Sequence, residues 1–321
     1  MARGWQRVDP LKPLHIQTPL LESRPIGRRA GCRIWLKLEN TQPTGTFKIR
    51  GIGNLCQHAR KKGIKHFVSS SGGNAGYAAA YAGRNLSIPV TVFVPSTTPQ
   101  DTIAKIEEQE ARVIVKGSVW DETHEHAACF SEEVNGLYIS PFDHPLIWEG
   151  HSTIVDEIVE KIPRPDAVIV SVGGGGLLCG VIEGLKRNDW ADVPVIAVET
   201  EGTASLSGSL KAGKLVTLEA ITGIAKSLGA KTVTHKALEW SKVHEIRSVV
   251  VTDQEALSAC FYFADDHRFL VEPACGSSLA VPYSRPQLLK AGGSAVIIVC
   301  GGIGVDLTKL QEWKMQNPVR F

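Results

Sequence analysis

The chain has 321 residues, of which 43% are hydrophobic and 21% are charged. These proportions are typical of an ordinary soluble globular protein, and the length is sufficient for two domains. The 35 basic and 33 acidic residues leave a net charge of only +2. Such a balanced charge argues against nucleic-acid and membrane-surface partners.

The first residues and the cysteines indicate the compartment. The segment from Met1 to Asp9 is polar and lacks the apolar core of a secretory signal. No apolar run approaches the roughly 20 residues that span a bilayer. The seven cysteines are scattered and form no Cys-x-x-Cys pair, which is typical of proteins from reducing compartments. We therefore expect a cytoplasmic protein without a membrane segment.

Short apolar segments rich in valine and isoleucine recur along the chain, each bounded by glycine, proline or charged residues. Their apolar residues are continuous rather than alternating, which predicts strands that are buried on both faces. The predicted strands span residues 33–38, 66–69, 90–94, 113–115, 167–172, 195–199 and 295–299.

Helical segments lie between these strands, and the alternation predicts an α/β fold with mainly parallel sheets. The predicted helices span residues 52–62, 75–84, 102–110, 123–133, 154–162 and 178–186. An irregular stretch at 140–150 separates two strand–helix series, so we expect two domains. The large domain would comprise residues 1–39 and 144–321, and the small domain residues 40–143.

One lysine stands at the entry to a helix. Lys48 follows a turn rich in proline and glycine, within the segment Gln42-Pro43-Thr44-Gly45-Thr46-Phe47-Lys48-Ile49-Arg50-Gly51. A positioned and partly desolvated amine can form a Schiff base with an aldehyde. Most lone lysines are solvated surface residues, so this segment alone leaves both interpretations open.

A turn of small residues, Ser69-Ser70-Ser71-Gly72-Gly73-Asn74-Ala75-Gly76, joins a predicted strand to a predicted helix. Small residues let the backbone approach a ligand closely, and the N–H groups at a helix start favour an anion such as a carboxylate. The same segment could be a tight structural turn in which Asn74 caps the helix.

Four consecutive glycines, Gly173 to Gly176, form a second strand-to-helix turn. Backbone N–H groups in such a turn make a cradle for phosphate. Glu199, at the end of the next strand, suggests a dinucleotide site in which an acid binds the ribose. The G-x-G-x-x-G spacing fails, however, because Leu178 and Cys179 stand where glycine is required. We therefore favour phosphate binding over dinucleotide binding.

Three further segments place polar residues in loops. Cys300 follows the last strong strand, where it could face a ligand or simply be buried, and Glu272 lies in a loop that enters a helix. Histidines and carboxylates gather between Pro141 and His151 without the spacing of a metal site. We interpret that stretch as a structural hinge.

Together and in this order, these segments resemble the serine/threonine dehydratases of the fold-type-II pyridoxal-phosphate superfamily, from Thr18 to about Leu310. The most specific pieces are Pro43–Lys48, Ser71–Asn74, Pro141–Asp143, Gly173–Gly176 and Cys300–Gly302. Within the superfamily the chain looks closest to the short serine dehydratases and serine dehydratase-like proteins. Three stretches carry that likeness, Pro145–His151, Leu228–Val233 and Val271–Gly276. The resemblance implies a two-domain, tryptophan synthase β-like architecture, each domain an open, mainly parallel sheet flanked by helices.

The resemblance also implies the roles of individual residues. Lys48 would form the Schiff base with pyridoxal phosphate and later act as the general base, and Phe47 would pack against the pyridine ring. The remaining assignments are Asn74 to the phenolic oxygen, Ser71, Gly72, Asn74 and Ala75 to the substrate carboxylate, Gly173, Gly174, Gly175, Gly176 and Leu177 to the phosphate, and Cys300 to the pyridine nitrogen.

Members of this superfamily also bind a monovalent cation such as potassium. By analogy, the Glu199 carboxylate and carbonyl groups near Thr203, Leu228 and Ala230 would coordinate it. This assignment gives Glu199 an alternative to ribose binding. A homodimer is the further expectation from the resemblance.

The implied activity is β-elimination of L-serine to pyruvate and ammonia, and of L-threonine to 2-oxobutyrate and ammonia. We expect a catabolic enzyme, since too little chain follows Gly302 for the regulatory domain of biosynthetic threonine deaminases. The alternatives are a β-replacement enzyme similar to cysteine synthases, a nicotinamide-dependent oxidoreductase, and a binding protein that retains the cofactor with little turnover.

Two single residues and one short segment depart from the family pattern. Ala75 stands where many relatives have histidine, and the apolar segment Ile303-Gly304-Val305 stands where polar residues are usual. Serine racemases carry a serine at the position of Gly72, and that serine supplies a proton to the face opposite the lysine. Because Gly72 has no side chain, we expect elimination without D-serine, and a larger pocket beside the substrate.

Overall fold

The computed structural model describes residues 12–316, which form two compact units. The segment Met1 to Asp9, interpreted above as lacking a signal core, lies outside the described residues. In the described part of the chain, the larger unit comprises residues 17–47 and 142–316, and the smaller unit comprises residues 12–16 and 48–141. The division after residue 47 differs from the predicted division after residue 39. Residues 40–47 belong to the larger unit because the Asn40 and Phe47 N–H groups donate to Val299 and Cys300 carbonyls.

The smaller unit contains a four-stranded parallel sheet in the order β5-β4-β3-β6. The strands are β3 (Phe67–Ser69), β4 (Val90–Val94), β5 (Arg112–Val115) and β6 (Leu137–Tyr138). The helices are α2 (Lys48–Lys61), α3 (Asn74–Leu86), α4 (Gln100–Glu107) and α5 (Trp120–Glu133). Helices α3 and α5 pack against β3 and β4, so both central strands are buried, as their continuous apolar sequences predict.

The larger unit contains a six-stranded sheet in the order β1-β2-β10-β7-β8-β9. The strands are β1 (Leu20–Glu22), β2 (Arg33–Lys37), β7 (Ala167–Ser171), β8 (Val195–Thr200), β9 (Ile246–Val251) and β10 (Ser294–Ile298). Only the edge strand β1 is antiparallel to its neighbour in this sheet. The carboxyl ends of the other five strands therefore meet at one edge.

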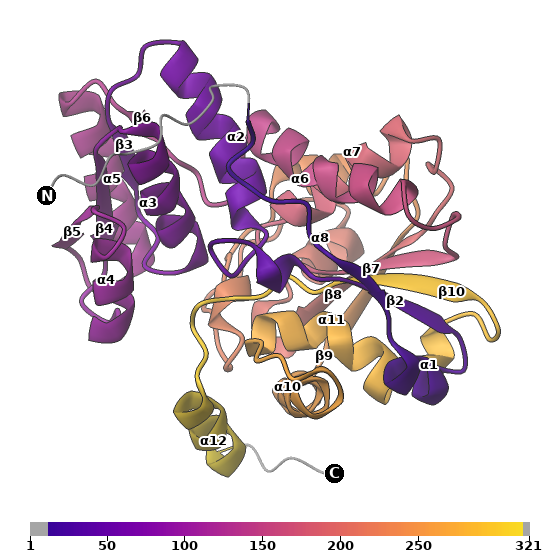
Figure 1. Ribbon diagram of the computed structural model, residues 1–321. Helices are drawn as coiled ribbons and strands as arrows, with labels where there is room; N and C mark the ends of the chain where they lie inside the picture. Colours follow the sequence, from indigo (N-terminus) through magenta and orange to yellow (C-terminus); the bar gives the residue numbers. More distant parts are fainter. Residues whose placement is uncertain (1–11, 317–321) are drawn as a thin grey trace, which may run out of the picture. The chain divides into compact units, whose positions relative to one another are not determined.

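Helices cover both faces of this sheet, with α6 and α7 above it and α10 and α11 below it in Figure 1. The helices of the unit are α1 (Arg24–Ala30), α6 (Pro145–Val159), α7 (Gly176–Arg187), α8 (Ser205–Ala212), α9 (His235–Trp240), α10 (Asp253–His267), α11 (Pro273–Ser284) and α12 (Leu307–Gln316). Short 3-10 turns occur at Glu39–Thr41, Glu201–Thr203, Lys226–Leu228 and Pro286–Leu288.

The structure corrects the interpretation of residues 140–150 as an irregular hinge. Helix α6 begins at Pro145, nine residues before the predicted start, because proline fits the first turn of a helix. The His144 side chain caps this helix by accepting a hydrogen bond from the Leu146 N–H at 3.0 Å. Only residues 140–144 lack helical structure.

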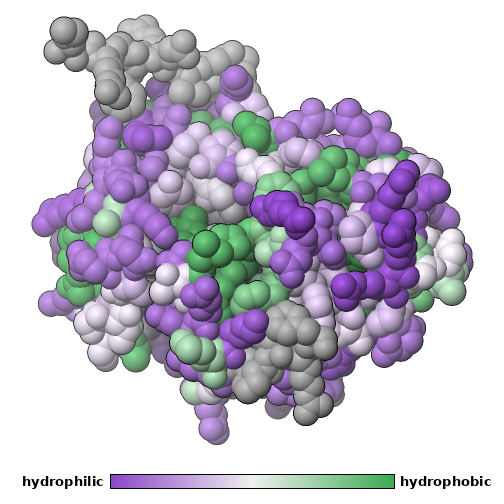
Figure 2. Space-filling model, turned by 60° about the horizontal axis from the view of Figure 1, so that its bottom comes forward, coloured by the Kyte–Doolittle hydropathy of each residue, from purple (hydrophilic) through white to green (hydrophobic). Residues whose placement is uncertain are grey.

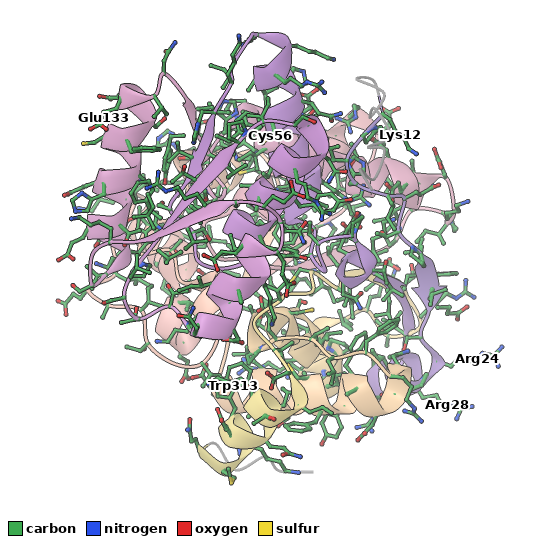
Figure 3. All side chains as sticks on the ribbon, turned by 60° about the vertical axis from the view of Figure 1, so that its left-hand side comes forward. Lys12, Arg24, Arg28, Cys56, Glu133 and Trp313 are labelled. Carbon is green, nitrogen blue, oxygen red and sulfur yellow. The ribbon has the colours of Figure 1, made fainter. Side chains whose placement is uncertain are left out.

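Buried apolar residues fill the interior of each unit and most charged side chains lie outside, although Lys37, Arg50 and Glu199 are buried. Figure 3 shows Cys56 among the elements of the smaller unit and Arg24 and Arg28 extending outward from α1. Hydrophilic residues cover most of the face drawn in Figure 2. Between residues 12 and 316, none of the helices combines the length and the apolar character that a bilayer span requires.

Candidate active site

Lys48 is the first residue of α2, four residues before the predicted start of that helix. Its side chain is partly buried, and Nζ donates a hydrogen bond to the Pro141 carbonyl at 2.5 Å. Both residues belong to the smaller unit. The amine is therefore not the solvated surface lysine that was the alternative interpretation.

The loop after β3 is built by its own serines. The Ser69 hydroxyl accepts from the Ser71 N–H and the Ser71 hydroxyl accepts from the Gly73 N–H, both at 3.4 Å. The loop passes so close to α3 that a Cβ at Gly76 would lie 1.8 Å from the Ser71 carbonyl oxygen. A glycine is therefore required there.

The structure corrects the suggestion that Asn74 caps α3. Gly73 is the N-cap, Asn74 is the first helical residue, and no side chain caps the helix. The N–H groups of the first turn have no intrahelical acceptor. A helix start of this kind is a common place for an anion to bind.

The space beside Gly72 is already filled, which corrects the expectation of a larger pocket. A Cβ at Gly72 would lie 2.9 Å from both Cγ2 and Oγ1 of Thr98, and 3.3 Å from Cγ1 of Val94. Thr98 thus occupies the direction in which a side chain at residue 72 would point. Thr98 has no sequence signal, because it reaches Gly72 only through the packing of the turn after β4 on the loop.

The four glycines connect β7 to α7 in the larger unit. Gly175 is the N-cap of α7 and has a φ of +88°, a left-handed conformation that favours glycine. A Cβ at Gly174 would lie 2.2 Å from Cγ of Phe142, and one at Gly173 would lie 3.0 Å from Cα of Leu228. Close packing therefore explains why side chains are excluded from this turn.

Backbone donors remain available in the same turn. The Gly174 carbonyl accepts from the Thr234 N–H at 2.9 Å, which holds the turn in place. Within residues 12–316, no protein group accepts a hydrogen bond from the N–H of Gly176 or Leu177. These groups stand at the positive end of the α7 dipole, so the turn is suited to phosphate.

Phe142 and Asp143 support this turn, although no individual sequence motif predicted this role for them. The Phe142 ring lies against Gly174, and its carbonyl accepts from Trp148 Nε1 at 2.9 Å. Asp143 Oδ1 accepts from the Thr234 hydroxyl at 2.6 Å. The only sequence signal was the family-like segment that contains both residues.

Cys300 follows β10 and is almost fully buried. The hydrogen bond with the Cys275 thiol, together with burial and the nearby Glu272, raises the pKa of Cys300 well above its ordinary value, although the Ser171 hydroxyl opposes this shift. The side chain is therefore a neutral thiol.

Phe47 lies close to Cys300 along the backbone. Its N–H donates to the Cys300 carbonyl at 3.3 Å, and its ring meets the His151 ring edge-on with centroids 4.9 Å apart. The adjacent Thr46 is only 1% exposed, and its hydroxyl has no hydrogen-bond partner among the described residues. An unpartnered buried hydroxyl at this point is consistent with a bound polar group.

Glu199 is buried at the end of β8. Its carboxylate accepts from the Leu206 and Ser207 N–H groups at 2.7 and 2.8 Å. Burial raises the pKa of Glu199 to about 7, although these two hydrogen bonds oppose the shift. This carboxylate lies inside the protein and is hydrogen-bonded to a helix start, which argues against the ribose contact of the dinucleotide interpretation.

The other residues expected at a cation site show mixed roles. The Thr203 hydroxyl is hydrogen-bonded to Thr200, and the Leu228 carbonyl accepts from the Ala230 N–H at 2.8 Å. Ser205 is fully buried, and its hydroxyl has no partner within the described chain. Among residues 12–316, no group of three or more His, Cys, Asp and Glu side chains could hold a metal ion. Any cation here would therefore rely on carbonyl and hydroxyl oxygens around one carboxylate.

Comparison with known proteins decides the family. The family model described as "Pyridoxal-phosphate dependent enzyme" matches residues 11–301. The chain belongs to this family. A partly buried lysine amine, a glycine turn at a helix start and a neutral thiol are compatible with the aldehyde, phosphate and pyridine nitrogen of such a cofactor.

The family's individual members show further similarity. Human "L-serine dehydratase/L-threonine deaminase" is 49% identical over 315 residues, covering 95% of this chain and 96% of its own. Mouse "Serine dehydratase-like" is 48% identical over 314 residues, with 95% of each chain covered. The solved structure of an L-serine ammonia-lyase from the fungus Rhizomucor miehei superposes with a TM-score of 0.91 at 38% identity. That comparison covers 95% of this chain and all of the fungal one, so the fold is that of fold-type-II pyridoxal-phosphate enzymes.

Proposed function

We propose that the protein is an ammonia-lyase that converts L-serine to pyruvate and ammonia, and L-threonine to 2-oxobutyrate and ammonia. The observation that carries this proposal is the sequence similarity to serine dehydratases, which extends over nearly the full length of this chain and of each relative. The partly buried Lys48 and the glycine turn support it, because they match two separate groups of the cofactor.

Lys48 has two roles in this proposal. Its amine would hold the aldehyde of pyridoxal phosphate, and as a free amine it would remove the proton from Cα of the substrate. The bound cofactor supplies an electron sink for the negative charge that develops at Cα. The Pro141 carbonyl, 2.5 Å from Nζ, orients the amine.

The two small-residue turns bind the anionic groups. Gly173, Gly174, Gly175, Gly176 and Leu177 hold the phosphate through backbone N–H groups at the start of α7. Ser71, Gly72, Asn74 and Ala75 hold the carboxylate of the substrate at the start of α3. The Asn74 amide also reaches the phenolic oxygen of the cofactor, as the family resemblance implies.

Cys300 and Phe47 contact the pyridine ring in this proposal. A carboxylate beside the ring nitrogen would keep that nitrogen protonated, whereas the neutral thiol of Cys300 does not. The weaker electron sink suits elimination, because a long-lived carbanion invites side reactions. Phe47, whose ring contacts His151, would pack on the pyridine ring.

We extend the proposal to a cation, an assembly and a compartment. A potassium ion would bind Glu199, Thr203, Leu228 and Ala230, and the unpartnered Ser205 hydroxyl supports an additional oxygen ligand there. The enzyme would act as a homodimer, as the family resemblance implies. It would be cytoplasmic, which is supported by seven cysteines that are all unpaired.

Pyruvate release from unmodified L-serine tests the function. Purified protein with pyridoxal phosphate should absorb near roughly 410–420 nm, the range in which this cofactor absorbs when it is bound to a lysine amine. The band should change when L-serine is added. Pyruvate is measured by coupling to lactate dehydrogenase. A β-replacement enzyme would instead need an activated leaving group and a second nucleophile. A protein that shows the absorbance but releases no pyruvate would contradict the proposal.

A further inference from the structure

Three side chains of the smaller unit form a hydrogen-bonded chain that ends in the serine loop. Ser70 Oγ lies 2.6 Å from the Tyr138 hydroxyl, and this hydroxyl lies 2.8 Å from Nδ1 of His124. Ser70 belongs to the loop after β3, Tyr138 ends β6, and His124 lies in α5. Both distances are short enough for well-formed hydrogen bonds.

The far end of this chain is held by aromatic contacts. The His124 ring meets the Tyr138 ring edge-on with centroids 5.0 Å apart. Trp120, one turn earlier in α5, stacks on the His124 ring, with the ring centroids 5.1 Å apart and the planes only 7° from parallel. Since α5 packs on β3 and β4, His124 gives the Tyr138 hydroxyl a partner on a supported helix.

Strand pairing brings Tyr138 to the start of the loop. Tyr138 pairs with Val68 in the parallel register of β6 and β3, and the Ile139 N–H donates to the Val68 carbonyl at 2.7 Å. Two residues beyond Val68, the Ser70 side chain is 1% exposed. Burial also raises the pKa of Tyr138, although its bond to Ser70 opposes the shift, so the phenol keeps its proton.

The bond between Ser70 and Tyr138 differs from the other bonds of the loop. The bonds made by Ser69 and Ser71 hydroxyls are long, at 3.4 Å, and stay within the loop itself. The bond to Tyr138 is 2.6 Å long and reaches another strand. Because a phenol has one proton, it donates to one neighbour and accepts from the other, which also orients the Ser70 hydroxyl.

We propose that Tyr138, held by His124, is a positioning residue for the recognition of the substrate carboxylate. It acts through Ser70, which directly precedes the residues Ser71 to Ala75 that are proposed to bind the carboxylate. Without the Tyr138 hydroxyl, Ser70 loses its partner on β6 and the loop can leave the geometry that binds the carboxylate. This inference rests on the function proposed above and adds a determinant of substrate affinity.

Tyr138→Phe and Ser70→Ala remove the same hydrogen bond from opposite ends. Each variant should raise KM for L-serine about tenfold, the factor that corresponds to one net hydrogen bond, with kcat within about twofold of wild type. The double variant should show the same KM as either single variant, because the second change removes nothing more.

Tyr283→Phe is the matched control. Tyr283 is a partly buried tyrosine of the larger unit whose hydroxyl donates to Asp266 at 2.8 Å. This variant should lower Tm to a similar extent as Tyr138→Phe and leave KM unchanged. Amide hydrogen exchange of residues 69–76 in the holoenzyme gives a second readout, and it should rise in Tyr138→Phe and Ser70→Ala but not in the control.

The outcomes separate this inference from the proposed function. Pyruvate release by the wild-type enzyme tests the function without any variant. If the wild type releases no pyruvate, the slowing of exchange in residues 69–76 by L-serine replaces KM as the measure of affinity. Unchanged exchange in Tyr138→Phe, unchanged affinity for serine, or effects of the two single variants that multiply in the double variant would each overturn the inference.

Discussion

The space that Thr98 fills beside Gly72 predicts a specific pattern of stability changes. In Gly72→Ala, the new Cβ would lie 2.9 Å from two Thr98 atoms, Cγ2 and Oγ1. Carbon atoms are normally in contact at about 3.5 Å or more, so the overlap with Cγ2 is roughly 0.6 Å, and that with the smaller oxygen Oγ1 is slightly less. Either the loop or the turn that carries Thr98 must move.

Rotation of Thr98 cannot relieve this overlap. A threonine has heavy atoms in two of its three staggered γ positions, and both of these positions face residue 72. Every other rotamer keeps at least one heavy atom in one of those two positions. We therefore expect Gly72→Ala to lower the free energy of unfolding by about 2 kcal/mol, the usual range for overpacking.

The residue exchanged at position 98 should decide whether the loss is recovered. Thr98→Ser leaves one γ atom, which can rotate to the third position, so Gly72→Ala/Thr98→Ser should recover most of the stability. Thr98→Val keeps both branches and should recover none. Gly73→Ala is the control within the same loop, because a Cβ there would meet nothing within 4 Å.

Urea denaturation of the holoenzyme, followed by circular dichroism, measures these differences. The coupling free energy between Gly72→Ala and Thr98→Ser should be about 1–2 kcal/mol, and that between Gly72→Ala and Thr98→Val should be near zero. If Gly72→Ala is as stable as Gly73→Ala, or if valine rescues as well as serine does, then Thr98 does not limit the side chain at position 72.

The remaining predictions concern the cofactor, the cation and the stereochemistry. Lys48→Ala should abolish pyruvate release while the glycine turn still binds some cofactor, and wild-type-like activity would refute the assignment. Gly175→Asp should weaken cofactor binding about a hundredfold relative to Gly175→Asn, which has the same shape without the charge that repels phosphate; equal affinities in a cofactor titration would place the phosphate elsewhere. At pH 8, above the pKa of about 7 for Glu199, potassium should raise Tm by roughly 5 °C over tetramethylammonium, and Glu199→Gln should remove this effect; an equal rise in both proteins would exclude Glu199 from the site. Chiral chromatography should find almost no D-serine, because Gly72 has no side chain to donate a proton, and racemisation as fast as pyruvate release would contradict this reasoning.

The central strands were largely predictable from sequence, because a strand buried on both faces has a continuous run of apolar residues. The segment at 90–94 is strand β4 without any shift, and the predicted strand at 167–172 differs from β7 by one residue. Continuous β-branched residues are needed wherever helices cover both faces of a parallel sheet. The strands β1, β6 and β9, which lie at sheet edges, were not predicted: β1 and β6 have only three and two residues, and β9 is partly exposed.

The principal candidate residues were also visible in the sequence, because they depend on backbone chemistry. Lys48 after a Pro/Gly turn and four glycines before a helix are both local sequence patterns. In the structure, the first pattern places Lys48 at the partly buried start of α2, and the second provides the left-handed Gly175 at the start of α7. The domain boundary was less visible, since hydrogen bonds to residues 299 and 300 assign residues 40–47 to the larger unit.

Other features were decided by the tertiary structure alone. The Gly72 position is closed because Thr98, 26 residues away in the chain, packs against it. Ser70 is held because strand pairing brings Tyr138 to it across a separation of 68 residues. Glu199 is an acidic residue at the place expected of a ribose ligand, but its carboxylate accepts hydrogen bonds from N–H groups in the first turn of α8 instead. A sequence pattern records the demands of local backbone geometry and burial, whereas a contact between distant side chains exists only once the sheet has set their register and the helices have packed upon it.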